Sequence, residues 1–324
     1  MAIKKSTISR NDCIYECFPH LCRTKTGRLI LTYRESNGHV ASQFCRLVVR
    51  LSDDSGHNWS DRVVLADEDR SSGILTTWNC PKMQQLADGR IVLLCDMNLY
   101  PPGEWGDGER NCRIFLWYSH DDGKTWSESQ PTPVEGLCPD QITEMPDGRW
   151  LLPTNVTSKT TGNCVQNITV SRDSGRNWEE PVTIFDDPAY SLSEGSIVRC
   201  PGGELIIYLR EESRVLRPLQ KMISLDGGCT WKGPYDTLNP AAQGMPIAGL
   251  TQDGLMMTPS ALVLRGIPPF LLCFPPPSVC VVLWGRRVCA KRSPGPMRTA
   301  ACPLETPRQG YSDELRRWGS RELS

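Results

Sequence analysis

Ionisable side chains at the ends of predicted β-strands are the candidates for chemistry in this sequence of 324 residues. An arginine guanidinium binds both oxygens of a carboxylate and never loses its charge, so arginines in this position favour an acidic ligand. A glutamate or histidine beside them can transfer a proton when its environment tunes its pKa. The candidates for proton transfer are Glu194, Glu35 and His39, and those for substrate binding are Arg210, Arg34, Asp96 and Asp140.

An octapeptide, Ser-x-Asp-x-Gly-x-(Thr/Asn)-Trp, indicates the elements that must position these side chains. It occurs at 52–59, 119–126, 171–178 and 224–231, so successive copies start 67, 52 and 53 residues apart. The glycine supplies a backbone conformation closed to other residues, the serine and aspartate can bond nearby amides, and the tryptophan packs back onto the sheet. Each copy therefore predicts a turn between two strands, and the spacing is near the period of propeller blades.

A second repeat consists of two short apolar runs joined by a glycine-containing turn, which is the strongest short-range signal of a β-hairpin. A third strand leads from each of the first four hairpins into an octapeptide and a fourth strand follows it, as in a four-stranded propeller blade. No segment has the spacing of an amphipathic helix, so we predict an all-β fold. The five hairpin turns are at 26–28, 88–90, 147–149, 202–204 and 253–255.

The order of strands also predicts which residues share a face. In an antiparallel blade the start of the first strand and the end of the second strand lie at one end, and the hairpin turn and the octapeptide lie at the other. The first of these ends is the expected front, around the central channel where a propeller binds ligands. The polar residues that we expect there are His20, Arg34, Glu35, Asp96, Asp140, Asn155, Glu194, Arg210 and Glu211.

The octapeptides resemble the Asp box, or BNR repeat, of the sialidase superfamily, and the resemblance covers about residues 10–255. The segment from Ser193 to Arg210 is similar to the one that carries a catalytic glutamate and a substrate-binding arginine in that family. The resemblance implies a six-bladed-type β-propeller and a glycoside hydrolase of the exo-α-sialidase type, which cleaves terminal sialic acid or another acidic sugar. It implies that Glu194 takes the proton of a tyrosine nucleophile, whose phenol has an unperturbed pKa near 10, and that Arg210 is one of three arginines on the sugar carboxylate.

Two expected residues of that family are replaced near the N-terminus. Cys17 occupies the place of the first arginine, two residues before the proline that opens the first blade. Arg34 ends the next strand on the same face, so we expect it to act instead, unless it only pairs with Glu35. The loop at 35–43 contains no aspartate to act as acid/base, so Glu35 or His39 is left for proton transfer.

The third arginine and the tyrosine are also missing from their expected places, since 243–246 reads Gln-Gly-Met-Pro and Tyr311 lies outside any recognisable pattern. These departures leave two alternatives open. One is a non-catalytic glycan-binding or interaction propeller, and the other is an inactive truncated homologue.

Composition bounds the partners and the compartment. The net charge of −1 and the pI of about 6.4 do not favour nucleic acid or an anionic membrane as a partner. The N-terminus has basic residues but no apolar run, so we expect no secretory signal and a cytoplasmic location. The 15 cysteines are scattered without CxxC pairs, which indicates reduced core thiols and no metal site. No motif predicts a cofactor.

The pattern changes in mid-blade, and we predict a propeller of about four and a half blades at 1–256 and a Pro/Arg/Cys-rich tail at 257–324. A reading-frame change or disorder would account for this tail, and the C-terminal blades are expected to be degraded or incomplete. The stretch Pro268–Trp284 is apolar, but its five prolines disfavour a membrane-spanning helix, because an interior proline costs about 3 kcal/mol.

Overall fold

The computed structural model describes residues 7–39, 44–67, 75–100, 111–213, 215, 217–238, 244–250 and 256–257. All of them lie in the first of the two units into which the chain divides, Met1–Arg286, whereas the second unit is Arg287–Ser324. Every element of the described part is a β-strand. The all-β prediction is therefore confirmed, and the predicted tail lies outside the described residues except for Met257.

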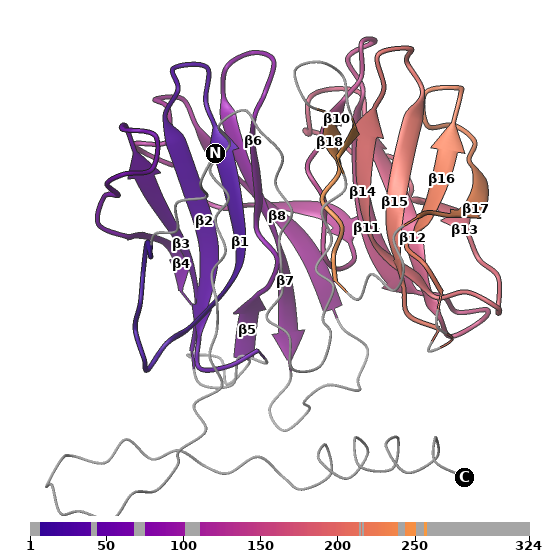
Figure 1. Ribbon diagram of the computed structural model, residues 1–324, viewed down its shortest axis with the longest axis horizontal. Helices are drawn as coiled ribbons and strands as arrows, with labels where there is room; N and C mark the ends of the chain where they lie inside the picture. Colours follow the sequence, from indigo (N-terminus) through magenta and orange to yellow (C-terminus); the bar gives the residue numbers. More distant parts are fainter. Residues whose placement is uncertain are drawn as a thin grey trace, which may run out of the picture. The chain divides into compact units, whose positions relative to one another are not determined.

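Four antiparallel sheets follow one another along the chain, each with its strands side by side in sequence order (Figure 1). Blade 1 contains β1 (Tyr15–Arg23), β2 (Leu29–Ser36), β3 (Cys45–Ser52) and β4 (Val63–Asp67). Blade 2 contains β5 (Leu75–Trp78), β6 (Lys82–Gln85), β7 (Ile91–Tyr100), β8 (Asn111–Ser119) and β9 (Gln130–Glu135), and both β5 and β6 pair with β7.

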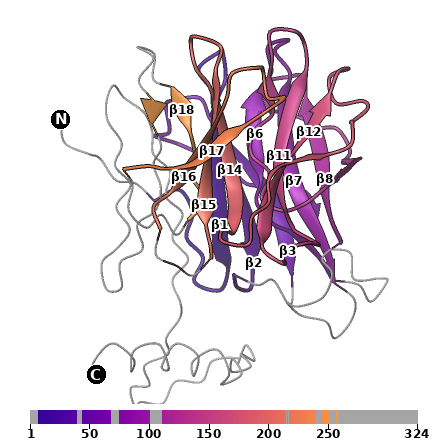
Figure 2. The same ribbon diagram turned by 90° about the vertical axis from the view of Figure 1, so that its right-hand side faces the viewer.

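Blade 3 contains β10 (Thr143–Glu144), β11 (Trp150–Thr157), β12 (Cys164–Ser171) and β13 (Val182–Phe185). Blade 4 contains β14 (Leu192–Arg199), β15 (Leu205–Glu211), β16 (Gln220–Ser224) and β17 (Lys232–Asp236). The fifth predicted hairpin is formed by β18 (Gly249–Leu250) and β19 (Met256–Met257). Figure 2 shows most strands of the four blades lying close to the vertical axis of the view. These four sheets form a β-propeller arrangement, as predicted, whereas six blades and degraded C-terminal blades stay predictions.

Apolar seams between neighbouring blades form the core, because alternate residues of a strand point to opposite faces of its sheet. One seam joins blades 1 and 2 through side chains such as Ile30 and Trp117, and others join blades 2 and 3 and blades 3 and 4. Each fully buried large side chain stabilises the fold by about 1.5–3 kcal/mol. The tryptophans of the last three octapeptides, Trp126, Trp178 and Trp231, pack one against each seam.

Each octapeptide forms a hydrogen-bonded turn at the end of the third strand. In the first copy the Ser52 hydroxyl donates to Asp54 Oδ1 and accepts from the Gly56 amide at 2.9 Å. The Trp59 indole donates to the Gly56 carbonyl at 3.1 Å, and Gly56 has a φ of 86°. The other three copies repeat these bonds. The predicted structural role of the octapeptide is therefore present in all four copies.

The register places these turns opposite the start of each blade. In blade 1, Ser52 pairs with Leu29 at one end, whereas Tyr15 pairs with Ser36 at the other end. In the part of the chain that the structure describes, no helix is long and apolar enough to cross a membrane. The apolar stretch Pro268–Trp284 lies outside that part.

Candidate active site

The first strand of every blade is interrupted at the same place. The three residues there have the pattern X-Pro-Y in most blades. The register shifts there in β1 and β14, and the interruption separates β5 from β6. The strand-break residues, as we call those at position X, are Phe18, Cys80, Cys138, Glu194 and Met245. The φ values of Phe18, Cys138 and Glu194 are 53°, 46° and 50°. This left-handed backbone conformation costs about 1–2 kcal/mol in any residue but glycine. Backbone strain of this kind clusters at functional sites.

Glu194 forms an ion pair with Arg210, which lies on the neighbouring strand. Ser193 on β14 pairs with Arg210 on β15, so the two side chains start from adjacent positions. Arg210 Nη1 lies 2.9 Å from Glu194 Oε1 and 2.8 Å from Glu212 Oε1. The side chain of Arg210 is 29% exposed, so part of it remains open to a ligand. The structure thus brings together the two residues that the family resemblance singled out.

The second oxygen of the Glu194 carboxylate is not used in this ion pair. Glu194 Oε2 is buried and has no hydrogen-bond partner among the described residues. Burial raises the pKa of Glu194, and the charge of Glu212 raises it as well, while Arg210 and Lys82 oppose the shift. A buried carboxylate with a raised pKa and a free oxygen is a good proton acceptor.

Arg34 lies at the same end of blade 1 and is 3% exposed. It pairs across β1 and β2 with Cys17, the residue that replaces the family's first arginine. Its guanidinium donates to Asn79 Oδ1 and to the Gly38 carbonyl, both at 3.3 Å, and also to the His39 carbonyl. The Arg34 guanidinium carbon lies 4.7 Å from the centre of the Phe18 ring. Arg34 is therefore a fixed positive charge beside the strand break of β1.

His39 joins this cluster although it is an exposed residue. Its Nδ1 lies 3.4 Å from the Tyr15 hydroxyl, and its ring makes an edge contact with Phe18 at 5.5 Å between centroids. Burial of the ring lowers the pKa of His39, and the charges of both Arg34 and Arg210 lower it further. The imidazole is therefore neutral at neutral pH and lies within the field of both arginines.

Glu35 lies apart from the cluster, in contrast to what the sequence predicted. Neighbouring residues of a strand point to opposite faces, so Glu35 faces away from Arg34. Its carboxylate is 1% exposed and forms an ion pair with Arg62. Burial raises the pKa of Glu35, and the charges that act on it come from Arg62, Glu16, Arg46 and Arg50. Glu35 is placed to hold blade 1 together.

Asp96 and Asp140 are buried anchors in the described structure, whereas the sequence suggested ligand contacts. Asp96 Oδ1 accepts from the Cys80 amide at 2.9 Å, and Oδ2 accepts from the Asn79 side chain at 3.0 Å and from the Cys138 amide at 3.3 Å. Asp140 Oδ2 accepts from the Ile197 amide at 3.0 Å. Their oxygens are thus engaged with the backbone that shapes the site.

Asp140 belongs to a repeated contact between blades. The side chain at position Y of a strand break accepts a hydrogen bond from a backbone amide of the next blade. The donor is the residue that directly follows position Y in that blade. His20 accepts from Met83 at 3.3 Å, and Ser196 accepts from Ala248 at 2.8 Å. Lys82 departs from this pattern because an ammonium cannot accept.

Lys82 instead extends across the ring of strand breaks. It is 5% exposed, and its Nζ lies 3.3 Å from the Met245 sulfur, which belongs to the hairpin segment that follows blade 4. Its charge acts on Glu194, Asp140 and His20, and the pKa of His20 is lowered to about 3 by burial and by Lys82. Lys82 is therefore a buried positive charge near the candidate base.

Asn79, Lys82, Cys138 and Tyr15 lie at the site although the sequence did not predict them there. The signal that could have found the first three is the repeated X-Pro-Y pattern, which aligns Cys80 and Cys138 with Glu194. Asn155 and Glu211 lie next to the site as predicted: the Asn155 side chain accepts from the Glu194 amide at 3.4 Å, and Glu211 accepts from the Ser191 amide at 3.1 Å. Within the described ranges, no group of three His, Cys, Asp or Glu side chains could hold a metal ion.

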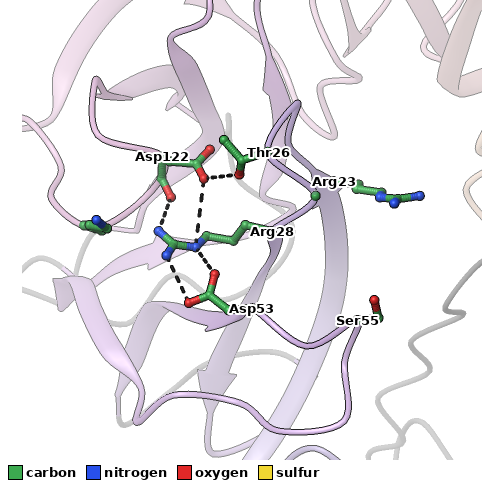
Figure 3. A pocket seen from close by; sticks show the side chains of 8 residues that line it. Arg23, Thr26, Arg28, Asp53, Ser55 and Asp122 are labelled. Atoms are coloured by element: carbon green, nitrogen blue, oxygen red, sulfur yellow. Dashed lines mark hydrogen bonds and ion pairs between the residues drawn. The ribbon is translucent and has the colours of Figure 1, made fainter.

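A hollow of about 570 Å³ lies at the opposite end of the blades, between the hairpin turn of blade 1 and two octapeptides (Figure 3). Arg28 lies in it, with its Nε 2.6 Å from Asp53 Oδ1 and its Nη1 3.0 Å from the Asp122 carbonyl. The Thr26 hydroxyl donates to Asp122 at 2.6 Å. These contacts link blade 1 to blade 2. The hollow therefore lies where the turns of the two blades meet.

Comparison with known proteins bears on the family and the fold. Residues 27–264 match the model of the family described as a BNR repeat-like domain. A sialidase of Paraclostridium sordellii is 25% identical over 228 residues, which are 64% of this chain and 53% of that protein. The chain thus spans about half the length of this curated relative.

Two solved structures share the fold. A protein of unknown function from Dyadobacter fermentans has a TM-score of 0.62 at 18% identity, covering 79% of this chain and 77% of that chain. A Hadza microbial sialidase has a TM-score of 0.59 at 20% identity, covering 76% of this chain and 53% of that chain. At these identities the likeness establishes the fold alone.

Proposed function

The chain belongs to the BNR repeat-like family within the sialidase superfamily, and on this premise we propose that it is a glycoside hydrolase of the exo-α-sialidase type. Its substrate would be a glycan that ends in sialic acid or another acidic sugar. The observation that carries the proposal is the Glu194–Arg210 pair. One carboxylate oxygen of Glu194 binds the arginine, and the other has no hydrogen-bond partner among the described residues. This pair supplies a proton acceptor and a cation in contact with each other.

Each residue of the cluster has a role in this proposal. Arg210 binds the sugar carboxylate through the part of its guanidinium that is exposed, and Arg34 adds a second positive charge in place of the residue replaced by Cys17. Glu194 accepts the proton of the attacking nucleophile through Oε2. His39, whose neutral ring feels the charges of both arginines, is the second candidate for proton transfer and would act as a base in this form. Glu35, Asp96 and Asp140 support the scaffold.

The type of propeller, the partners and the location in the cell belong to the same proposal. The four blades and the β18–β19 hairpin support a ring of the six-bladed type, whose C-terminal blades we expect to be degraded or incomplete. The acidic pI of about 6.4 supports a protein that binds neither nucleic acid nor membranes. We place it in the cytoplasm, where the scattered cysteines would stay reduced.

Turnover of a fluorogenic sialoside by the purified chain, together with calorimetry of free sialic acid, tests this function. We expect both hydrolysis and binding, and we expect Arg210→Ala to abolish binding. A chain that neither binds sialic acid nor hydrolyses the sialoside contradicts the proposal.

A non-catalytic glycan-binding propeller is the second candidate. It is favoured by Cys17 at the place of an arginine and by the lack of an aspartate at 35–43. Binding of free sialic acid without turnover would support this alternative, since a guanidinium such as that of Arg210 can bind a carboxylate without any catalytic group.

A further inference from the structure

Two cysteines face each other beneath the candidate site. The sulfur atoms of Cys80 and Cys138 are 3.6 Å apart, and the residues occupy equivalent strand-break positions in blades 2 and 3. They are 58 residues apart in the sequence, so the fold alone brings them together. Both residues are buried, with Cys80 6% exposed and Cys138 9% exposed.

One carboxylate fixes the backbone of both cysteines. Asp96 Oδ1 accepts from the Cys80 amide at 2.9 Å, and Asp96 Oδ2 accepts from the Cys138 amide at 3.3 Å. The Asn79 amide group also lies 3.8 Å from the Cys138 sulfur. Both cysteines precede a proline, whose ring restricts the backbone further. The two thiols are therefore held in place with only their side-chain torsions left to change.

We propose that Cys80 and Cys138 form an oxidisable dithiol site, which a small peroxide converts into a disulfide that links blades 2 and 3 at the floor of the candidate active site. The inference does not depend on the proposed function. It assigns a role to two thiols that the proposed hydrolysis does not use.

The reaction balances with hydrogen peroxide as the oxidant. One thiol gives up its proton and its thiolate attacks a peroxide oxygen. The O–O bond breaks, and the hydroxide that leaves takes up that proton, so the products are a sulfenic acid and water. The second thiolate attacks the sulfenic sulfur, the S–S bond forms, the S–O bond breaks, and a second water leaves. Two thiols are oxidised by two electrons and one peroxide is reduced to two waters. The sulfur atoms must approach from 3.6 Å to about 2.05 Å, which rotation about the side-chain bonds can supply.

The neighbours of the pair determine how the site behaves. The hydrogen bond with Cys80 contributes most to the raised pKa of Cys138. Burial and the charges of Asp96 and Glu194 raise this pKa further. The thiolate fraction is therefore small, and the oxidation is slow compared with that of an exposed thiol. Cys138 also lies 3.9 Å from Glu194 Oε1, so a disulfide here would alter the surroundings of the candidate base.

Peptide mapping of the full chain tests the proposal. Trypsin places Cys80 in the peptide 71–82 and Cys138 in the peptide 125–149, and each peptide contains a single cysteine. The chain is treated with hydrogen peroxide, its remaining thiols are blocked with N-ethylmaleimide, and it is digested without reductant. We expect a linked pair of these two peptides, lighter than their sum by two hydrogen atoms, which separates on reduction.

Variants provide the controls. Cys80→Ala and Cys138→Ala must each abolish the linked pair, whereas Cys13→Ala, which removes an exposed thiol, must leave it unchanged. If an alanine variant fails to fold, the mapping of the unaltered chain still decides the question. Equal blocking of both thiols with and without peroxide, a link from Cys80 to Cys17 or Cys95, or oxidation of Cys138 to a sulfinic acid would each overturn the proposal.

Discussion

Glu194 and Arg210 meet across the first two strands of blade 4, with Arg210 Nη1 2.9 Å from one carboxylate oxygen of Glu194. The other oxygen is buried and has no partner among the described residues. Glu212 binds the same Arg210 nitrogen at 2.8 Å. The arginine is thus shared by two carboxylates, of which Glu194 occupies a strand-break position and has a left-handed backbone. This difference makes Glu212 a matched control for Glu194.

Arg210→Lys is expected to weaken binding of free sialic acid. Lysine keeps the positive charge but loses the planar fork that binds both carboxylate oxygens. Loss of one charge-assisted hydrogen bond costs about 1.5–3 kcal/mol, or a Kd about tenfold to a hundredfold higher. Calorimetry measures the change, with Arg172→Lys, at a residue whose side chain is 67% exposed, as the control. Equal affinity in both variants would remove Arg210 from the binding site.

Lys82→Met is expected to move the acidic limb of the pH profile of turnover to higher pH. Burial raises the pKa of Glu194, and Lys82 opposes that shift, so loss of the ammonium raises the pKa further. Glu194 accepts a proton only when it is deprotonated, so activity disappears at a higher pH than in the unaltered chain. Rate measurements across pH provide the test, with Lys25→Met as an exposed control. A limb that stays in place would show that Lys82 does not act on the base.

Glu35→Gln is expected to leave turnover of the fluorogenic sialoside unchanged and to change stability little. The structure pairs this buried carboxylate with Arg62 on the side of blade 1 that faces away from Arg34. Burial raises the pKa of Glu35 although Arg62 opposes the shift, so a neutral side chain is tolerated at this position. Glutamine also keeps an oxygen that can accept from Arg62, whose side chain is 39% exposed. Urea unfolding and steady-state kinetics on the same sample check both parts. A large loss of turnover in a folded Glu35→Gln variant would return Glu35 to the list of catalytic candidates.

The octapeptide turns are expected to lose stability in acid. Hydrogen bonds, mainly from the residue four positions further along, lower the pKa of Asp54, Asp121 and Asp226 to about 2. An aspartate with a lowered pKa stabilises the folded state above its unfolded pKa of about 3.9, and this stabilisation is lost as the pH falls towards 2. Melting temperatures measured from pH 5 to about pH 2 should therefore fall, and less steeply in Asp121→Asn. Identical slopes would contradict this account.

The blades were predictable because their signals are local. A glycine in a tight turn and an aspartate that bonds the next amides need no distant partner, so the octapeptides and hairpins appear in the sequence as they do in the fold. The order of strands also placed Glu194, Arg210, Arg34 and His39 at one end. The strand order thus predicted the end of the blades at which these four residues lie.

The remaining assignments depend on packing that a single strand does not reveal. Asp96 and Asp140 carry charges at the predicted end, but backbone amides from neighbouring segments occupy their oxygens. Glu35 follows Arg34 directly, and the alternation of side chains along a strand could have indicated that both cannot face the same side. Asn79 and Lys82 become visible as site residues only when the strand breaks of different blades are superimposed.

Turnover of a fluorogenic sialoside by Glu194→Gln, compared with Glu212→Gln, tests the central claim most directly. Both variants remove one carboxylate from Arg210. We expect Glu194→Gln to lower kcat by about 10²–10⁴-fold, the usual contribution of a general base, and Glu212→Gln to have a much smaller effect. If the two variants retain the same turnover as the unaltered chain, Glu194 is not the base and the proposed active site is wrong.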